Sequence, residues 1–118
     1  QKMTVLDADT GKLVTTLAIG NGPDASAFDP SLSVAFSPNG EDGTLNVVKE
    51  TGPNVFKVVA TVPTQAGART MALDPKTHHI YLMTATMQAA PPADPAAGGA
   101  PPRRGVVPGS YVVLDFAP

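Results

Sequence analysis

The sequence contains no cysteine, which excludes disulfide bonds and thiolate metal sites. It has no tryptophan, four phenylalanines and two tyrosines, so an aromatic stacking platform for single-stranded nucleic acid would be thin. Charged residues make up only 15% of the chain, and the net charge is −2. This mildly acidic balance gives no electrostatic footprint for nucleic acid or for an anionic membrane.

Long apolar runs and helical periodicity are missing as well. No run approaches the roughly 18 residues of a membrane-spanning helix, and no window repeats apolar residues at the helical period between capping residues. Residues 1–9 lack the charged and apolar regions of a signal peptide. No P-loop, dinucleotide fingerprint or nucleophile elbow is present, so the sequence implies no cofactor and no catalytic residue.

What the sequence does contain is a repeat of short β-strands. Residues 22–30 read GPDASAFDP and residues 67–75 read GARTMALDP, and each copy follows a β-rich run. A repeat of about 45 residues built from short strands is typical of a four-stranded β-propeller blade. Since propellers have at least about four blades, we expect an all-β fold that is a fragment of a propeller.

The turn residues Gly, Pro, Asn and Asp divide the chain into nine predicted strands. They cover residues 3–7, 13–19, 25–28, 33–36, 44–49, 55–62, 69–73, 79–84 and 111–116. These strands form a strand pair (1–20), a complete blade (21–63) and an incomplete blade (64–118). Ser37-Pro38-Asn39-Gly40 is predicted to be a turn. Residues 88–109 hold six of the thirteen prolines and predict a long Pro/Ala/Gly-rich loop.

The loop and strand at Gly20, Gly22, Pro23, Ala27 and Asp29-Pro30, together with the stretch ALDPKTHHIYL at 72–82, resemble the YVTN-type, or YncE-like, propeller repeat family. The resemblance covers nearly the whole chain apart from residues 88–109. Residues 81–84 read YLMT where the family has its signature tetrapeptide. The resemblance implies a ring of usually seven blades and an exported protein, periplasmic or extracellular.

The loops of a propeller alternate between its two faces. Loops 20–24, 38–43, 64–68 and 88–109 would share the face on which propeller ligand sites most often lie. The long loop is therefore placed either to cover a site or to be a tolerated surface insertion.

Three arginines are the candidate ligand-binding residues. Arg69 begins an inner strand, and Arg103 and Arg104 lie in the long loop. Together they could bind a carboxylate or phosphate through bidentate hydrogen bonds. The alternative is that Arg103 and Arg104 are solvated and that Arg69 caps neighbouring carbonyls.

Two other clusters favour a structural role over a metal site. His78 and His79 are adjacent, so on a strand their side chains point to opposite faces and cannot easily share one ion. Glu41 and Asp42 could bind a cation together with loop carbonyls, but carboxylates flanked by glycines are also common in exposed turns.

Three functions remain compatible with these features. The first is a non-catalytic binding or scaffold propeller with an unknown small-molecule or protein ligand. The second is part of a propeller enzyme, a metal-dependent lactonase or a quinoprotein-like oxidoreductase, whose active-site residues lie mostly in missing blades. The third is nucleic-acid binding, as in some relatives, which the low basicity opposes. Unpaired edge strands expose backbone groups, so we expect edge pairing with missing blades or with another copy of the chain.

Overall fold

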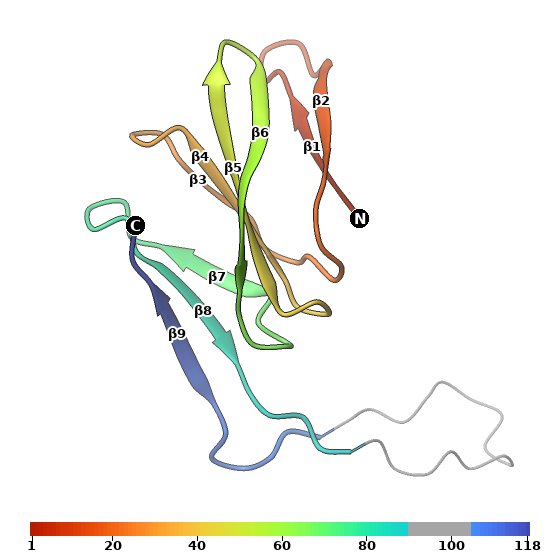
Figure 1. Cartoon of the computed structure of the whole chain (residues 1–118), viewed down its shortest axis with the longest axis vertical. Helices are drawn as coiled ribbons and strands as arrows, with labels where there is room; N and C mark the ends of the chain where they lie inside the picture. The colour runs from red at the N-terminus through yellow and green to blue at the C-terminus, as the bar shows by residue number, and fades with distance from the viewer. Residues whose placement is uncertain (90–104) are drawn as a thin grey trace, which may run out of the picture.

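The computed structural model describes residues 1–89 and 105–118 (Figure 1). It is all-β, as expected, with no helix among the described residues. The described part therefore holds no apolar helix of membrane-spanning length. Arg103, Arg104 and most of the predicted loop lie outside the described residues.

The strands form three antiparallel sheets in which each strand pairs with its neighbour in sequence. The two-stranded sheet contains β1 (Lys2–Leu6) and β2 (Leu13–Ala18). The four-stranded sheet contains β3 (Ala27–Asp29), β4 (Val34–Asn39), β5 (Thr44–Gly52) and β6 (Val55–Pro63). The three-stranded sheet contains β7 (Thr70–Leu73), β8 (Ile80–Thr84) and β9 (Val112–Phe116). None of the three sheets closes on itself within the described ranges.

The predicted turn at Ser37-Pro38-Asn39-Gly40 is wrong, because β4 continues through Asn39 and the turn follows at Gly40–Gly43. Pro38 pairs with Leu45 of β5. On the other side of β4, the pairing with β3 ends at Phe36. Beyond that point this side of β4 forms only an isolated bridge, between Asn39 and Pro23, among the described residues, and a proline without an N–H group is tolerated at such an irregular edge.

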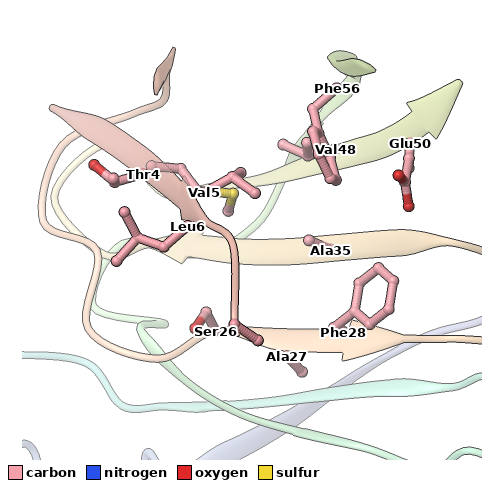
Figure 2. A pocket seen from close by; sticks show the side chains of 12 residues that line it. Thr4, Val5, Leu6, Ser26, Ala27, Phe28, Ala35, Val48, Glu50 and Phe56 are labelled. Carbon is pink, nitrogen blue, oxygen red and sulfur yellow. The ribbon is translucent and has the colours of Figure 1, made fainter. Parts of the chain in front are cut away.

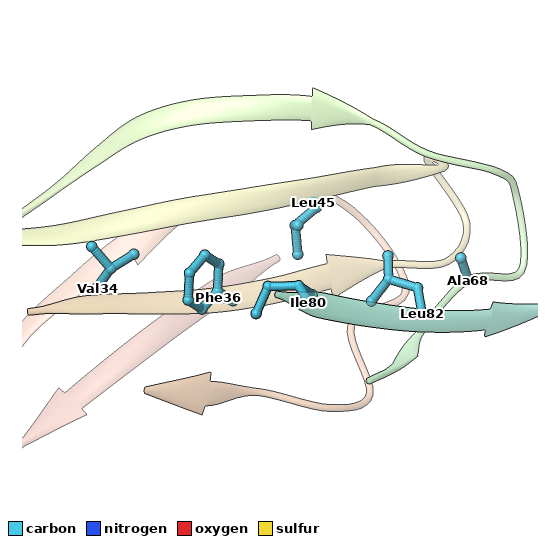
Figure 3. Packing of buried hydrophobic residues seen from close by; sticks show 6 residues of the cluster. All are labelled: Val34, Phe36, Leu45, Ala68, Ile80 and Leu82. Atoms are coloured by element: carbon cyan, nitrogen blue, oxygen red, sulfur yellow. The ribbon is translucent and has the colours of Figure 1, made fainter. Parts of the chain in front are cut away.

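The core lies between the four-stranded and three-stranded sheets, as Figure 3 shows. Side chains alternate between the two faces of a strand, so Val34 and Phe36 of β4 share a face, and Ile80 and Leu82 of β8 point back toward them. The opposite face of the three-stranded sheet is open, with Met83 55% exposed. The cluster of buried side chains consists of Val34, Phe36, Leu45, Ala68, Ile80 and Leu82.

The two larger sheets repeat each other down to the backbone of their first turn. Asp29 and Asp74 each accept a hydrogen bond from the amide two residues ahead, at 3.0 and 2.9 Å. Each turn then places a non-glycine residue in the left-handed region, Ser33 at φ 54° and His78 at φ 62°. Such residues are uncommon, and these two lie at the same step of the repeat.

Candidate functional site

Loops that are distant in sequence are hydrogen-bonded to one another at one end of the sheets. The β2–β3 loop contacts the β4–β5 turn, where the amide of Gly40 donates to the carbonyl of Gly22 at 2.9 Å. The same turn contacts the β6–β7 loop, where the amide of Gly67 donates to the carbonyl of Gly40 at 2.7 Å. We call these three segments, residues 20–24, 40–43 and 64–69, the loop face. They form one continuous surface.

Asp42 fastens two of these segments through its side chain. Its two carboxylate oxygens accept hydrogen bonds from the backbone amide of Asn21 at 2.8 Å and from the Asn21 side-chain amide at 3.0 Å. These bonds lower the pKa of Asp42, the backbone bond most strongly. Both oxygens are therefore engaged in holding the loops. Within residues 1–89 and 105–118 no three acidic, histidine or cysteine side chains gather as a metal site would require.

A buried polar network supports the loop face from below. Asn39 is fully buried, and its side-chain amide donates to Asn46 Oδ1 at 2.8 Å and to Thr44 Oγ1 at 3.0 Å. Asn46 Oδ1 also accepts from the amide of Gly20 at 2.9 Å, and its own amide donates to Thr61 at 2.8 Å. Asn39 Oδ1 has no hydrogen-bond partner among the described residues, so the network holds the loops through the Asn39 amide group and through both ends of the Asn46 side chain. Sequence reasoning missed Asn39 because the predicted turn ended its strand too early. It missed the role of Asn46, which lies in a predicted strand, because the partners of Asn46 come from other segments of the chain.

Arg69 lies on the loop face. Its Nε is 3.4 Å from Asp24 Oδ2, and the two side chains are 64% and 55% exposed. Its carbonyl accepts a hydrogen bond from the amide of Ala25 at 3.0 Å, which ties the start of β7 to the segment before β3. An ion pair between two side chains this exposed contributes little to the stability of the fold. The guanidinium therefore stays accessible to a ligand, while the backbone of the same residue is fixed.

The two histidines each contact a carboxylate that sequence reasoning did not pair with them. His78 Nδ1 is 2.6 Å from Asp29 Oδ2, and His79 Nδ1 is 2.7 Å from Asp115 Oδ1. The two histidines thus contact carboxylates on different strands, Asp29 on β3 and Asp115 on β9. The carboxylates were missed because they lie 49 and 36 residues away in sequence. The repeat could have indicated Asp29, since the β3–β4 and β7–β8 turns follow adjacent strands.

Asp29 is the most deeply buried carboxylate of the described residues, at 1% exposure. Its Oδ1 accepts from the amide and hydroxyl of Ser31 at 3.0 and 2.7 Å and from the amide of Leu32 at 3.3 Å. These bonds, the Ser31 hydroxyl first, hold its pKa at about 2, and His78 contributes in the same direction. The Asp29–His78 contact thus joins the two larger sheets at the end opposite the loop face.

Comparison of the chain with protein-family models, with curated proteins and with solved structures gave no match.

Proposed function

We propose that this chain is part of a non-catalytic, ligand-binding β-propeller and that the loop face is its binding surface. The observation that carries the proposal is the hydrogen-bonded joining of three loops from successive sheets around an exposed arginine. Rigid scaffolds that position surface loops are the usual basis of binding sites. A protein of this kind needs no catalytic motif, and the resemblance to an exported propeller family is consistent with it.

The propeller arrangement is supported by how the sheets repeat. The first strands of the two larger sheets, β3 and β7, lie next to each other, as the inner strands of neighbouring blades would. The space between β1 and the four-stranded sheet is a groove of about 580 Å³, lined by Val5, Phe28, Ala35 and Val48 among others (Figure 2). On the opposite side of β4, the equivalent space is filled by β7 and β8. We propose that an inner strand pair fills the groove in the complete ring.

The ligand that suits the loop face is a small anion or an acidic group. Arg69 is exposed and presents a planar fork of donors to solvent, which matches a carboxylate or phosphate. The amides of Gly40, Glu41 and Gly67 donate to carbonyls of the neighbouring loops, so the proposal assigns the ligand to the guanidinium and not to the backbone. Arg103 and Arg104, the other two predicted ligand-binding residues, lie outside the described residues, so the site is argued from Arg69 alone.

The experiment is a titration with phosphate and with citrate, followed by the backbone amide resonances in solution NMR. We expect saturable shifts confined to the loop face, residues 20–24, 40–43 and 64–69. Arg69→Gln should reduce the affinity at least about tenfold, since one charge-assisted bidentate contact is lost. Lys57→Gln is the matched control, because Lys57 lies on β6 away from the loop face. Shifts spread over the whole chain, or equal loss in both variants, would contradict the proposal.

A further inference from the structure

The outer edges of the three-stranded sheet, at β7 and at β9, pair with no described strand, and the edge at β9 is the one considered below. β9 pairs with β8 along one side, and no described strand pairs with its other side. The strand that corresponds to β9 in the four-stranded sheet is β5. It pairs with β4, the counterpart of β8, on one side and with β6 on the other. An unpaired edge offers a row of backbone donors and acceptors to an extended segment.

The internal repeat sets the correspondence between β5 and β9. Ser33 and His78 occupy the same turn position, so Ala35 corresponds to Ile80. Ala35 pairs with Val48, and Ile80 pairs with Phe116. Val48 of β5 therefore corresponds to Phe116 of β9, and two residues further on Glu50 corresponds to Pro118.

Beside the free edge lies an apolar cavity of about 290 Å³ between the two larger sheets. Phe116, Ala117 and Pro118 line it from one side, and Val47 and Val62 line it from the other. These valines belong to β5 and β6, the part of the four-stranded sheet nearest the position a strand beyond β9 would take. His78 is the sole titratable side chain among the described residues that line this cavity.

The groove between β1 and the four-stranded sheet is the counterpart of this cavity in the repeat. A phenylalanine of the fourth strand, Phe56, lines the groove, whereas the cavity has no such side chain among the described residues. Phe56 of β6 pairs with Glu50 of β5, and both line the groove beside β1 together with Val48 (Figure 2). Phe116 and Pro118, the counterparts of Val48 and Glu50, line the smaller cavity. No described residue stands there as a counterpart of Phe56.

We propose that the free edge of β9 binds an extended peptide segment that runs antiparallel to it and inserts one large apolar side chain into this cavity. The insertion point is opposite Pro118, as Phe56 is opposite Glu50. Two residues later the segment carries a β-branched residue opposite Phe116, as Val58 is opposite Val48. The partner is thus an extended apolar segment with the pattern Phe-x-Val. The inference rests on the repeated sheets that also support the proposed function.

Main-chain hydrogen bonds and the cavity supply different parts of this recognition. The backbone of β9 gives an affinity that does not depend on peptide sequence, and a pocket for alternate side chains gives specificity. The cavity is lined by apolar side chains except for His78, so a charged or small residue at the inserted position would leave it unfilled. The register fixes which peptide residue matters.

The test uses the chain and a fluorescent synthetic peptide of sequence VFKVVATVP, which is that of residues 55–63. Binding is measured by fluorescence anisotropy. We expect a saturable complex, weakened about 10- to 100-fold when the peptide phenylalanine is replaced by alanine, because a large apolar side chain is lost. Replacing the peptide lysine by alanine is the matched control and should change the affinity less than about threefold.

Hydrogen exchange locates the bound peptide. Amides of Val112–Phe116 on the free edge should exchange more slowly when the peptide is present, and the ring resonances of His78 should shift. Equal affinity of the phenylalanine and alanine peptides would overturn the proposal. So would protection on β5 instead of β9, which indicates strand exchange, or self-association of the chain that blocks the peptide. The anion titration at the loop face does not involve β9, so its outcome is independent.

Discussion

The β3–β4 turn and the β7–β8 turn have the same backbone, yet their aspartates are in different surroundings. Asp29 is 1% exposed and is hydrogen-bonded to His78 of the following sheet. Asp74 is half-buried, and its carboxylate is bonded within its own turn, to the Lys76 amide and the Thr77 hydroxyl. The conformation of the turn is therefore determined by hydrogen bonds within it, whereas the burial of its aspartate depends on a neighbouring sheet.

The same difference extends over the faces of the two sheets. The three-stranded sheet covers the core-facing side chains of the four-stranded sheet. The other face of the three-stranded sheet is exposed, as at Met83. Tyr81 and Met83 on that open face occupy the repeat positions of Phe36 and Pro38 in the four-stranded sheet. Each sheet thus depends on the next for the burial of one face, and the predictions below test how far that dependence goes.

The largest effect is expected from truncating a side chain between the sheets. Leu82→Ala removes a fully buried leucine and should lower the free energy of unfolding by about 4 kcal/mol. Met83→Ala, one residue along β8, removes a side chain that is 55% exposed and should cost less than about 1 kcal/mol. Urea denaturation followed by circular dichroism measures both. Equal losses would mean that the two sheets do not pack as described.

Two glycines with similar backbone angles give the next comparison. Gly22 has φ 71° and Gly11 has φ 67°. A Cβ on Gly22 would lie 2.8 Å from the backbone nitrogen of Glu41, while one on Gly11 would meet nothing within 4 Å. Gly11→Ala should therefore cost about 1 kcal/mol from the left-handed backbone alone. Gly22→Ala adds a clash within the loop face and should cost about 2 to 3 kcal/mol.

Thermal or urea unfolding of the two glycine variants decides this comparison. A Gly22→Ala variant no less stable than Gly11→Ala would show that the β2–β3 loop moves freely against the β4–β5 turn. The loop face would then not be a fixed surface, and the proposed binding site would lose its physical basis.

Local features of the sequence predicted much of this structure. The turn residues Gly, Pro, Asn and Asp located all nine strands, and the repeated Asp-Pro turns indicated equivalent units. The end of β4 was predicted wrongly, because Pro38 is a strand breaker only where its missing amide would be needed. Sequence spacing indicated loops that share a face, but not the Asn21–Asp42 and Asn39–Asn46 hydrogen bonds.

Contacts between repeats were the part that could not be predicted. The partners of the two histidines depend on how one sheet lies against another and on the register of β8 with β9. Neither is encoded in a local pattern of residues. The exposure of the Arg69 side chain also depends on how the sheets pack. Arg103 and Arg104 lie outside the described residues, so their exposure is not part of this comparison.

Acid unfolding should separate the two aspartate turns. The pKa of Asp29 is about 2 in the folded chain, below its ordinary value of 3.8. Its ionised form therefore stabilises the fold fully above about pH 4, and this contribution is lost as the pH falls toward 2. The melting temperature should drop over that interval. Asp29→Asn should remove more of the drop than Asp74→Asn, although hydrogen bonds, the Lys76 amide first, also lower the pKa of Asp74.

The larger effect is expected at Asp29 because its hydrogen bonds, the Ser31 hydroxyl first and His78 among them, lower its pKa to about 2 although burial acts to raise it. If both variants flatten the pH profile equally, the hydrogen bonds within each turn account for the whole effect. The contact with His78 would then contribute nothing measurable to holding the sheets together.

The smallest effect on stability is expected at Arg69, where the comparison moves from the fold to the surface. Its ion pair with Asp24 joins two exposed side chains, so Arg69→Gln should change the free energy of unfolding by less than about 0.5 kcal/mol. The carbonyl that accepts the Ala25 amide is retained, so the two larger sheets stay tied. A stable variant that no longer binds phosphate or citrate would assign the guanidinium to binding alone. A variant that unfolds easily would instead place Arg69 among the residues that hold the sheets together.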